Sequence, residues 1–144
     1  METKDFIAKA ETEINAPADN VWDALMNPAT IKKYMFGTEV VSDWKEGSTI
    51  IWKGEWQGKP YEDRGTILQI NPKTKLQYSH FSPLSGQADV PENYHLVTIE
   101  LKGQDAATIV TLYQDNNPTE QAKQHSEKNW AMMLADLKKV LEEK

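Results

Sequence analysis

Alternating hydrophobic and polar positions dominate the middle of the chain. Residues 6–14 begin the pattern, with one face carrying Phe6, Ala8, Ala10, Thr12 and Ile14. This alternation is typical of a half-buried β-strand. The same reasoning predicts strands over 48–56, 61–70, 76–81, 94–101 and 108–114, and a weak strand or loop over 38–48. Turn-forming sequences at 57–60 and 71–74 separate neighbouring strands.

Three other segments have hydrophobic residues at helical spacing. Pro17 fits the first turn of a short helix, and Asn27 followed by Pro28 predicts a second short helix over 28–35. Asn117 and Glu120 favour the start of a long C-terminal helix. Its apolar stripe comprises Ala122, Ser126, Trp130, Met133, Leu134, Leu137 and Leu141.

The order of these elements predicts an α+β protein. Strands joined by short turns pair antiparallel, so we expect a curved antiparallel sheet of six or seven strands. The sheet would wrap around the long C-terminal helix, with two short helices after the first strand and a single domain over residues 1–144. Because an architecture of this kind often leaves a cavity, ligand binding is the first functional class to consider.

Composition narrows the classes of partner. The formal net charge is −6, and Arg64 is the only arginine among 16 basic residues. Nucleic-acid binding is disfavoured, because phosphate recognition needs clustered basic residues. The sequence has no cysteine. It also shows no expected signal peptide or apolar run long enough to span a bilayer, so we expect a cytoplasmic protein with no membrane partner.

The inward face of the sheet should meet the apolar stripe of the C-terminal helix. Each aromatic residue on that face has an ordinary alternative role in packing the core. The functional interpretation is a closed pocket of several hundred Å³ with a few polar anchors. Its expected lining is Trp52, Trp56, Glu62, Arg64, Tyr78, His80, His95, Val97, Trp130, Met133 and Leu137.

Glu62 and Arg64 are the expected polar anchors. They alternate with Leu68 and Ile70, which places them on the predicted inner face. An inward Arg64 would pair with Glu62 or bind a ligand carboxylate or hydroxyl. The alternative is an ion pair in solvent at the end of the strand.

His80 and His95 flank the 82–93 segment. A register that opposes them also opposes Tyr78 to Val97, which keeps the apolar residues on one face. The imidazoles would form a pH-sensitive polar rim or remain ordinary, partly exposed histidines. A metal site would need further ligands such as Asp89 or Glu92, and we expect neither a metal nor a cofactor.

Three segments together resemble the START-like, helix-grip superfamily. They span residues 14–28, 65–78 and 129–141. Within that superfamily the chain is similar to homologues of the activator of the 90-kDa heat-shock-protein ATPase. The resemblance implies a sheet gripping the C-terminal helix, around a hydrophobic cavity whose ligands include lipids, sterols and polyketides.

The resemblance implies a small intracellular protein that binds an apolar or amphipathic molecule between sheet and helix. The alternative is an interaction module with a chaperone or other protein as partner, using an exposed patch of Tyr34, Met35, Phe36 and Trp44. Less favoured is a cavity enzyme of the cyclase or hydratase type. No catalytic motif is present, so enzymatic activity is left open and is the weaker expectation.

Overall fold

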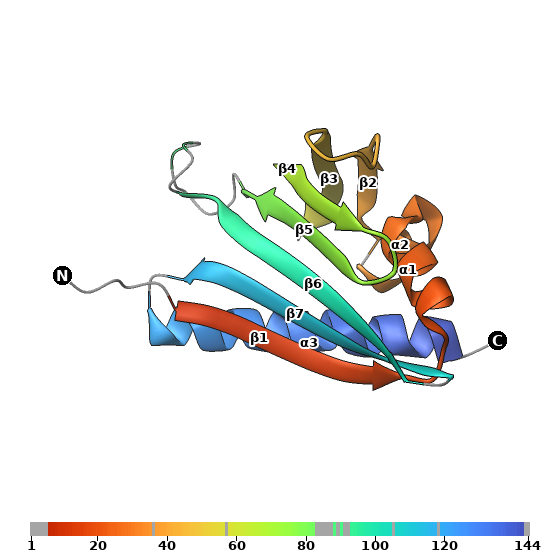
Figure 1. The fold of residues 1–144 in the computed structure, drawn as a ribbon. Helices are drawn as coiled ribbons and strands as arrows, with labels where there is room; N and C mark the ends of the chain where they lie inside the picture. Colours follow the sequence, from red (N-terminus) through yellow and green to blue (C-terminus); the bar gives the residue numbers. More distant parts are fainter. Residues whose placement is uncertain are drawn as a thin grey trace.

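Seven antiparallel strands form one sheet in the computed structural model (Figure 1). The structure describes residues 6–35, 37–56, 58–82, 88, 90, 93–104, 106–117 and 119–142, with the side chain of Trp56 left out. The strand order is β1-β7-β6-β5-β4-β3-β2. The strands are β1 (Phe6–Ile14), β2 (Glu39–Ser42), β3 (Thr49–Trp56), β4 (Lys59–Asn71), β5 (Lys75–His80), β6 (His95–Gln104) and β7 (Ala107–Asn117).

Three helices accompany the sheet: α1 (Ala18–Met26), α2 (Pro28–Tyr34) and α3 (Glu120–Glu142). The Asn27 side chain caps α2 by accepting the Ala29 N–H at 3.0 Å. Among the described residues, no helix is both long and apolar enough to cross a membrane. The predicted helix-grip architecture of two short helices and one long C-terminal helix is confirmed.

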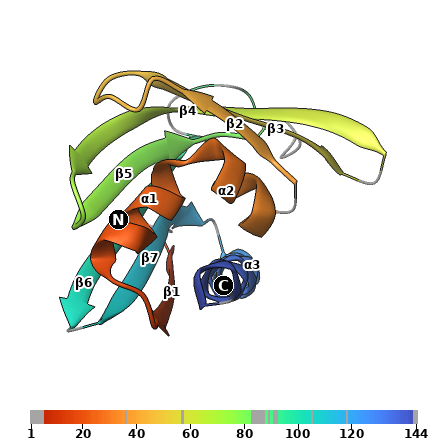
Figure 2. The same cartoon turned by 90° about the vertical axis from the view of Figure 1, so that its right-hand side faces the viewer.

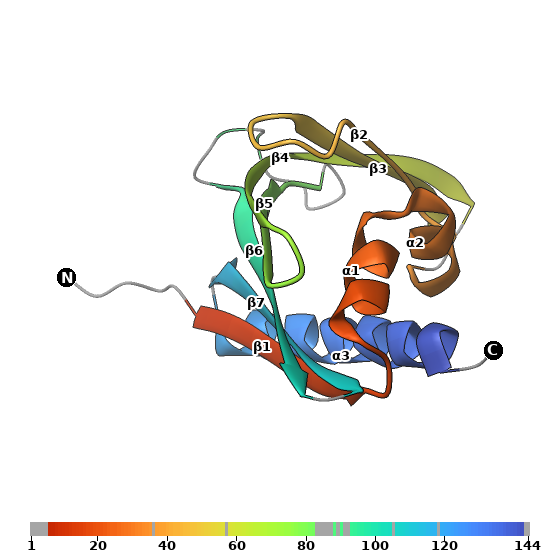
Figure 3. The same cartoon turned by 45° about the vertical axis from the view of Figure 1, so that its right-hand side comes forward.

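The sheet curves around α3. Seen along the helix axis, β1, β7 and β6 lie to one side of α3 and β2, β3 and β4 arch over it (Figure 2). The helices α1 and α2 fill the space between the arch and α3 (Figure 3). The fully buried core includes Val21 of α1, Val110 and Leu112 of β7, and Leu134 and Leu137 of α3.

A bulge in β4 changes which side chains face inward. Ile67 pairs with Tyr78, but the next paired residue is Gln69 with Gln77, so Leu68 is extra and 46% exposed. An extra residue reverses the alternation on its two sides. Glu62 and Arg64 are therefore exposed on the outer face. Their predicted inward orientation is wrong, because it was extrapolated across the bulge from Ile70.

The register between β5 and β6 is confirmed. His80 pairs with His95 and Tyr78 pairs with Val97. The register is predictable because side chains alternate between the two faces of each strand. A shift of one residue would place the apolar residues of β5 and β6 on opposite faces of the sheet.

The free edge of β1 is covered by side chains of α3. Glu127 Oε2 accepts the Lys9 N–H at 3.0 Å, and Glu142 Oε2 accepts the Asn15 N–H at 2.7 Å. Lys138 donates to the Glu13 carbonyl at 2.7 Å. The hydrogen bonds from Lys138 and from the Asn15 backbone lower the pKa of Glu142. These contacts satisfy backbone groups that an edge strand otherwise leaves unpaired.

Candidate functional site

Two small hollows lie between the strands β3–β5, the end of α2 and α3. The apolar hollow has a volume of about 30 Å³. The polar hollow has a volume of about 60 Å³. The apolar hollow is lined by Leu25, Ile31, Tyr34, Met35, Val40, Trp44, Ile50, Trp52, Leu76, Tyr78, Ile99 and Met133. The polar hollow is lined by Met35, Thr38, Trp52, Tyr61, Asp63, Tyr78, His80 and Trp130.

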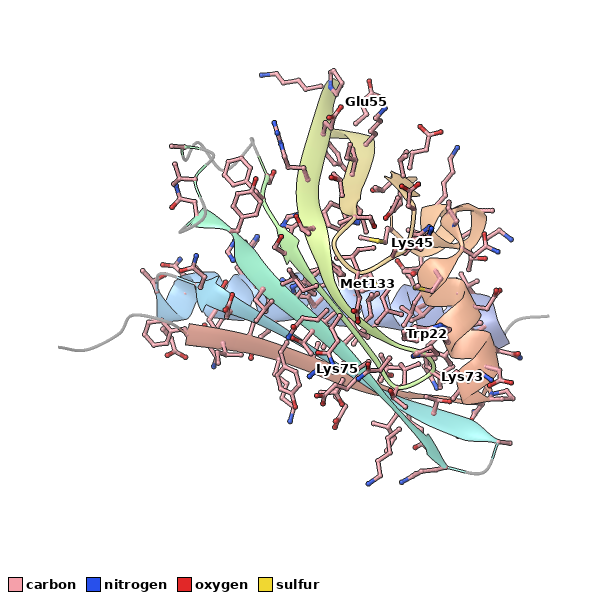
Figure 4. The ribbon with its side chains drawn as sticks, turned by 45° about the horizontal axis from the view of Figure 1, so that its top comes forward. Trp22, Lys45, Glu55, Lys73, Lys75 and Met133 are labelled. Carbon is pink, nitrogen blue, oxygen red and sulfur yellow. The ribbon has the colours of Figure 1, made fainter. Side chains whose placement is uncertain are left out.

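Met35, Trp52 and Tyr78 belong to both hollows and separate them. The Trp52 and Tyr78 rings pack with their centroids 5.1 Å apart. Met133 of α3 reaches the centre of the molecule, whereas Glu55 projects from the far end of β3 (Figure 4). The partition is therefore made of two packed rings and one flexible thioether side chain.

Asp63 and His80 provide the strongest polar contact in the polar hollow. His80 Nε2 lies 2.9 Å from Asp63 Oδ2, and the two side chains are 24% and 15% exposed. Because an ionised carboxylate only accepts hydrogen bonds, His80 donates through Nε2. Asp63 Oδ1 is buried and makes no hydrogen bond within the described part of the chain. Most buried polar atoms have a partner, so this oxygen retains unused accepting capacity.

Two glycines allow the polar hollow to form. A Cβ at Gly65 would lie 1.7 Å from the Ser79 carbonyl oxygen, so only glycine lets β4 approach β5 closely beside His80. A Cβ at Gly54 would lie 2.5 Å from the Tyr61 hydroxyl oxygen. The Tyr61 ring therefore lies across Gly54, and its hydroxyl is 2.9 Å from Thr38 Oγ1.

The remaining polar groups at this end are held by hydrogen bonds. The Trp130 indole N–H donates to Gln114 Oε1. His95 Nδ1 donates to the Asp115 carbonyl at 2.9 Å, and its ring lies 6.4 Å from that of His80. Among the described residues there is no cluster of three or more potential metal ligands, and Asp89 and Glu92 lie outside those residues.

Two tyrosines beside the hollows are strongly buried. Burial raises the pKa of Tyr78 well above its usual value. Burial, and then the proximity of Tyr78, raises the pKa of Tyr34 still further. The Tyr34 hydroxyl donates to the Ala24 carbonyl at 3.0 Å. Both hydroxyls are therefore neutral near physiological pH, because an ionised phenol is unfavourable without solvent.

The structure brings part of the predicted lining together. Trp52, Tyr78, His80 and Trp130 line the polar hollow, and Met133 lines the apolar one. Val97 and Leu137 are fully buried in the core and line neither hollow. His95 lies beside His80 without lining either hollow, and the Trp56 side chain lies outside the described part of the structure.

The predicted volume of several hundred Å³ is wrong for this conformation. Together the apolar and polar hollows are far smaller than the several hundred Å³ typical of ligand sites. The physical reason is the partition, since Met35, Trp52 and Tyr78 occupy the middle of the space that the sheet encloses.

The predicted interaction patch is wrong at Tyr34. Tyr34 is 2% exposed, because its hydroxyl bonds back to α1. Met35 and Trp44 are partly buried and line the apolar hollow. Phe36 lies outside the described residues.

A protein-family model matches residues 15–142, and its description is activator of Hsp90 ATPase homolog 1-like protein. The chain belongs to this family. The matched residues include every element from α1 to α3, in agreement with the helix-grip fold. No curated protein is significantly similar to the chain.

Solved structures share the fold of this chain. The solution structure of ChR145 from Cytophaga hutchinsonii is 63% identical, with a TM-score of 0.86, and the match covers 99% of this chain and 97% of ChR145. The Aha1 dimer from Colwellia psychrerythraea is 20% identical, with a TM-score of 0.73 and coverage of 96% and 97%. DynU16, from the dynemicin biosynthetic locus, is 16% identical, with a TM-score of 0.79 and coverage of 95% and 47%.

Sequence reasoning missed four residues that line the polar hollow, including Met35, which it assigned to a surface patch. Thr38, Tyr61 and Asp63 line it, yet the alternation assigned Tyr61 and Asp63 to the outer face. Gly54 and Gly65 were the available signal, because a glycine within a strand often marks a bulge or a close approach.

Proposed function

We propose that the chain binds a small amphipathic molecule in the space formed by the apolar and polar hollows. The observation that carries this proposal is the division of chemistry within one region between β3–β5, the end of α2 and α3. Apolar and aromatic side chains line one end, and Asp63, His80, Tyr61 and Thr38 gather at the other. Ligand sites combine a mainly apolar lining with a few placed polar groups.

Binding requires the two hollows to join. Met35 is the flexible part of the partition, with three rotatable bonds and a position just after α2. Rotation of its side chain would connect the hollows without moving the Trp52 and Tyr78 rings. The ligand would then place its apolar part toward Met133 and its polar part toward Asp63.

The binding test is an NMR titration of ¹⁵N-labelled protein with short-chain alcohols, amines, carboxylates and small phenols. Binding in the hollows should shift the indole N–H signals of Trp52 and Trp130, which line the polar hollow. Saturation at 100 times the dissociation constant should add about 2.7 kcal/mol to the free energy of unfolding. The midpoint temperature of thermal unfolding should then rise by roughly 5–10 °C.

A pair of identical substitutions locates the binding site. Met35→Trp should fill the partition and abolish the shifts, whereas Met132→Trp changes an α3 side chain that is 47% exposed and should leave them intact. Shifts that persist in a folded Met35→Trp protein would place the ligand elsewhere. The absence of binding by every compound would reject the proposal.

The alternative function as a chaperone-type interaction module has less support. Its expected surface was the patch of Tyr34, Met35, Phe36 and Trp44, and the three described members of that patch pack inward. The relation to the Aha1 dimer from Colwellia is a likeness of fold at 20% identity. Small-molecule binding is therefore the function that the geometry favours.

A further inference from the structure

We infer that the polar hollow recognises the ammonium end of an aliphatic amine. The inference rests on the proposed small-molecule function and specifies its ligand class. It differs from the chemistry expected from the sequence, in which Arg64 would pair with Glu62 or anchor a ligand carboxylate or hydroxyl. Because Arg64 faces outward and Asp63 faces inward, the polar end of the site is an acid.

The first argument is the incomplete hydrogen bonding of Asp63. His80 satisfies Oδ2, while buried Oδ1 has no partner within the described residues. A carboxylate oxygen can only accept, so the group that completes it must be a donor. Asp63 lines the polar hollow, so a donor bound there would lie beside this carboxylate.

The second argument is the aromatic lining around Asp63. Trp52, Tyr61, Tyr78 and Trp130 all border the same hollow. Aromatic faces attract a cation within about 6 Å of the ring centroid, and most strongly where water is excluded. An acid surrounded by aromatic rings is suited to an ammonium group, and the same rings offer no comparable attraction to a carboxylate.

The third argument is the sign of charge around the site. None of the described residues that line the polar hollow is lysine or arginine. His80 Nε2 donates to Asp63 Oδ2 and leaves Oδ1 without a partner among the described residues. A ligand carboxylate would meet the Asp63 carboxylate with no lysine or arginine in the described lining to compensate it, which is unfavourable in a partly buried site.

The size of the hollow limits the ligand. A water-sized group needs about 15 Å³ by this measure, so about 60 Å³ holds roughly four such groups. An unbranched primary ammonium with a short alkyl chain fits, and a longer chain would pass Met35 into the apolar hollow. Bulky quaternary ammonium groups should be excluded.

The test compares n-propylammonium, n-propanol and acetate, which have the same number of non-hydrogen atoms. NMR titrations at neutral pH would follow the Trp52 and Trp130 indole signals. We expect n-propylammonium to bind roughly tenfold or more tightly than n-propanol, and acetate not to bind, because hydrogen bonds to a charged group exceed neutral ones by about that factor.

Two neighbouring acids give a matched control. Asp63→Asn should weaken n-propylammonium binding roughly tenfold or more and remove its advantage over n-propanol. Glu62→Gln makes the same charge change on the exposed face of β4 and should leave both affinities unchanged. The wild-type comparison of three ligands decides the question even if Asp63→Asn fails to fold.

The outcomes separate this inference from the proposed function. Equal or tighter binding of acetate or n-propanol at the two tryptophans would overturn amine recognition and leave small-molecule binding intact. No binding by these three probes, together with no binding across the wider panel, would overturn both. Equal weakening by Glu62→Gln and Asp63→Asn would show a general charge effect and overturn the assignment to Asp63.

Discussion

The apolar hollow and the polar hollow share three lining residues but differ in how much each destabilises the folded protein. An unfilled apolar volume of about 30 Å³ costs less than about 1 kcal/mol in lost packing. A buried polar atom without a partner costs about 1–3 kcal/mol, and more when charged. Asp63 Oδ1 in the polar hollow is such an atom.

This difference shows that the polar hollow, and not the apolar one, contains a carboxylate with an unmet hydrogen-bonding requirement among the described residues. Small apolar gaps occur in ordinary cores and can partly collapse. The polar hollow is held open by oriented groups, because Tyr61 is bonded to Thr38 and His80 to Asp63. Asp63 Oδ1 has no hydrogen-bond partner among the described residues, and an unpartnered buried polar atom is uncommon enough to need an explanation.

The largest effect should come from Gly65→Ala. The new methyl group would lie 1.7 Å from the Ser79 carbonyl oxygen, so β5 must move away from β4 beside His80. We expect the free energy of unfolding to fall by about 3 kcal/mol in urea denaturation, with loss of the Asp63–His80 contact. Gly103→Ala is the control, since its Cβ would meet nothing nearer than 3.9 Å. Similar stability losses for both variants would refute the close approach at Gly65.

Met35→Ala should erase the distinction between the hollows. Removing the flexible partition joins them into one cavity and should lower the free energy of unfolding by about 2 kcal/mol. The enlarged cavity should bind xenon more tightly, as seen in shifts of amide signals around Met133. Met132→Ala, at a 47% exposed position, should change stability by less than about 0.5 kcal/mol and leave xenon binding unchanged. Unaltered xenon binding in Met35→Ala would mean that Met35 does not separate the hollows.

The smallest effect concerns Tyr34, which borders the apolar hollow alone, and Tyr78, which borders both. Both have a pKa raised by burial, so the unfolded chain releases their protons near pH 10 while the folded protein keeps them. Their contribution to the free energy of unfolding is complete below about pH 10. Above about pH 10 it falls by about 1.4 kcal/mol per pH unit for each tyrosine. Tyr34→Phe should cost about 1 kcal/mol at neutral pH through the lost bond to Ala24.

Urea unfolding between about pH 8 and about pH 11 would measure this slope. In Tyr34→Phe the free energy of unfolding should fall less steeply above about pH 10 than in the wild type, by about 1.4 kcal/mol per pH unit, because one titrating tyrosine is missing. If the two proteins lost stability in parallel across that range, Tyr34 would titrate alike in the folded and unfolded states.

The fold was predictable because its signals are local and repeated. The alternation of 6–14, the proline at 28 and the apolar stripe of 120–142 each specify an element without knowledge of the others. Even the β5–β6 register followed from matching Tyr78 with Val97. A shift of one residue there would have exposed a whole apolar face.

The polar hollow was not predictable in the same way. Ile67, Leu68 and Ile70 are all apolar, so periodicity gives no sign that Leu68 is the extra residue of a bulge. Because of that one extra residue, Tyr61 and Asp63 face inward, and Glu62 and Arg64, which were predicted there, face outward. The patch at Tyr34 failed for a related reason, because its burial depends on how α2 packs against α1 rather than on local pattern.

The covering of β1 by α3 has a consequence for synthesis. The backbone groups of Lys9 and Asn15 are satisfied by side chains that follow them by 118 and 127 residues. At the usual rates of translation those acids emerge roughly 6–24 s after the strand they cover. Until β7 and then α3 emerge, a nascent β1 has neither element beside it and is open to pairing with another chain on the same polysome.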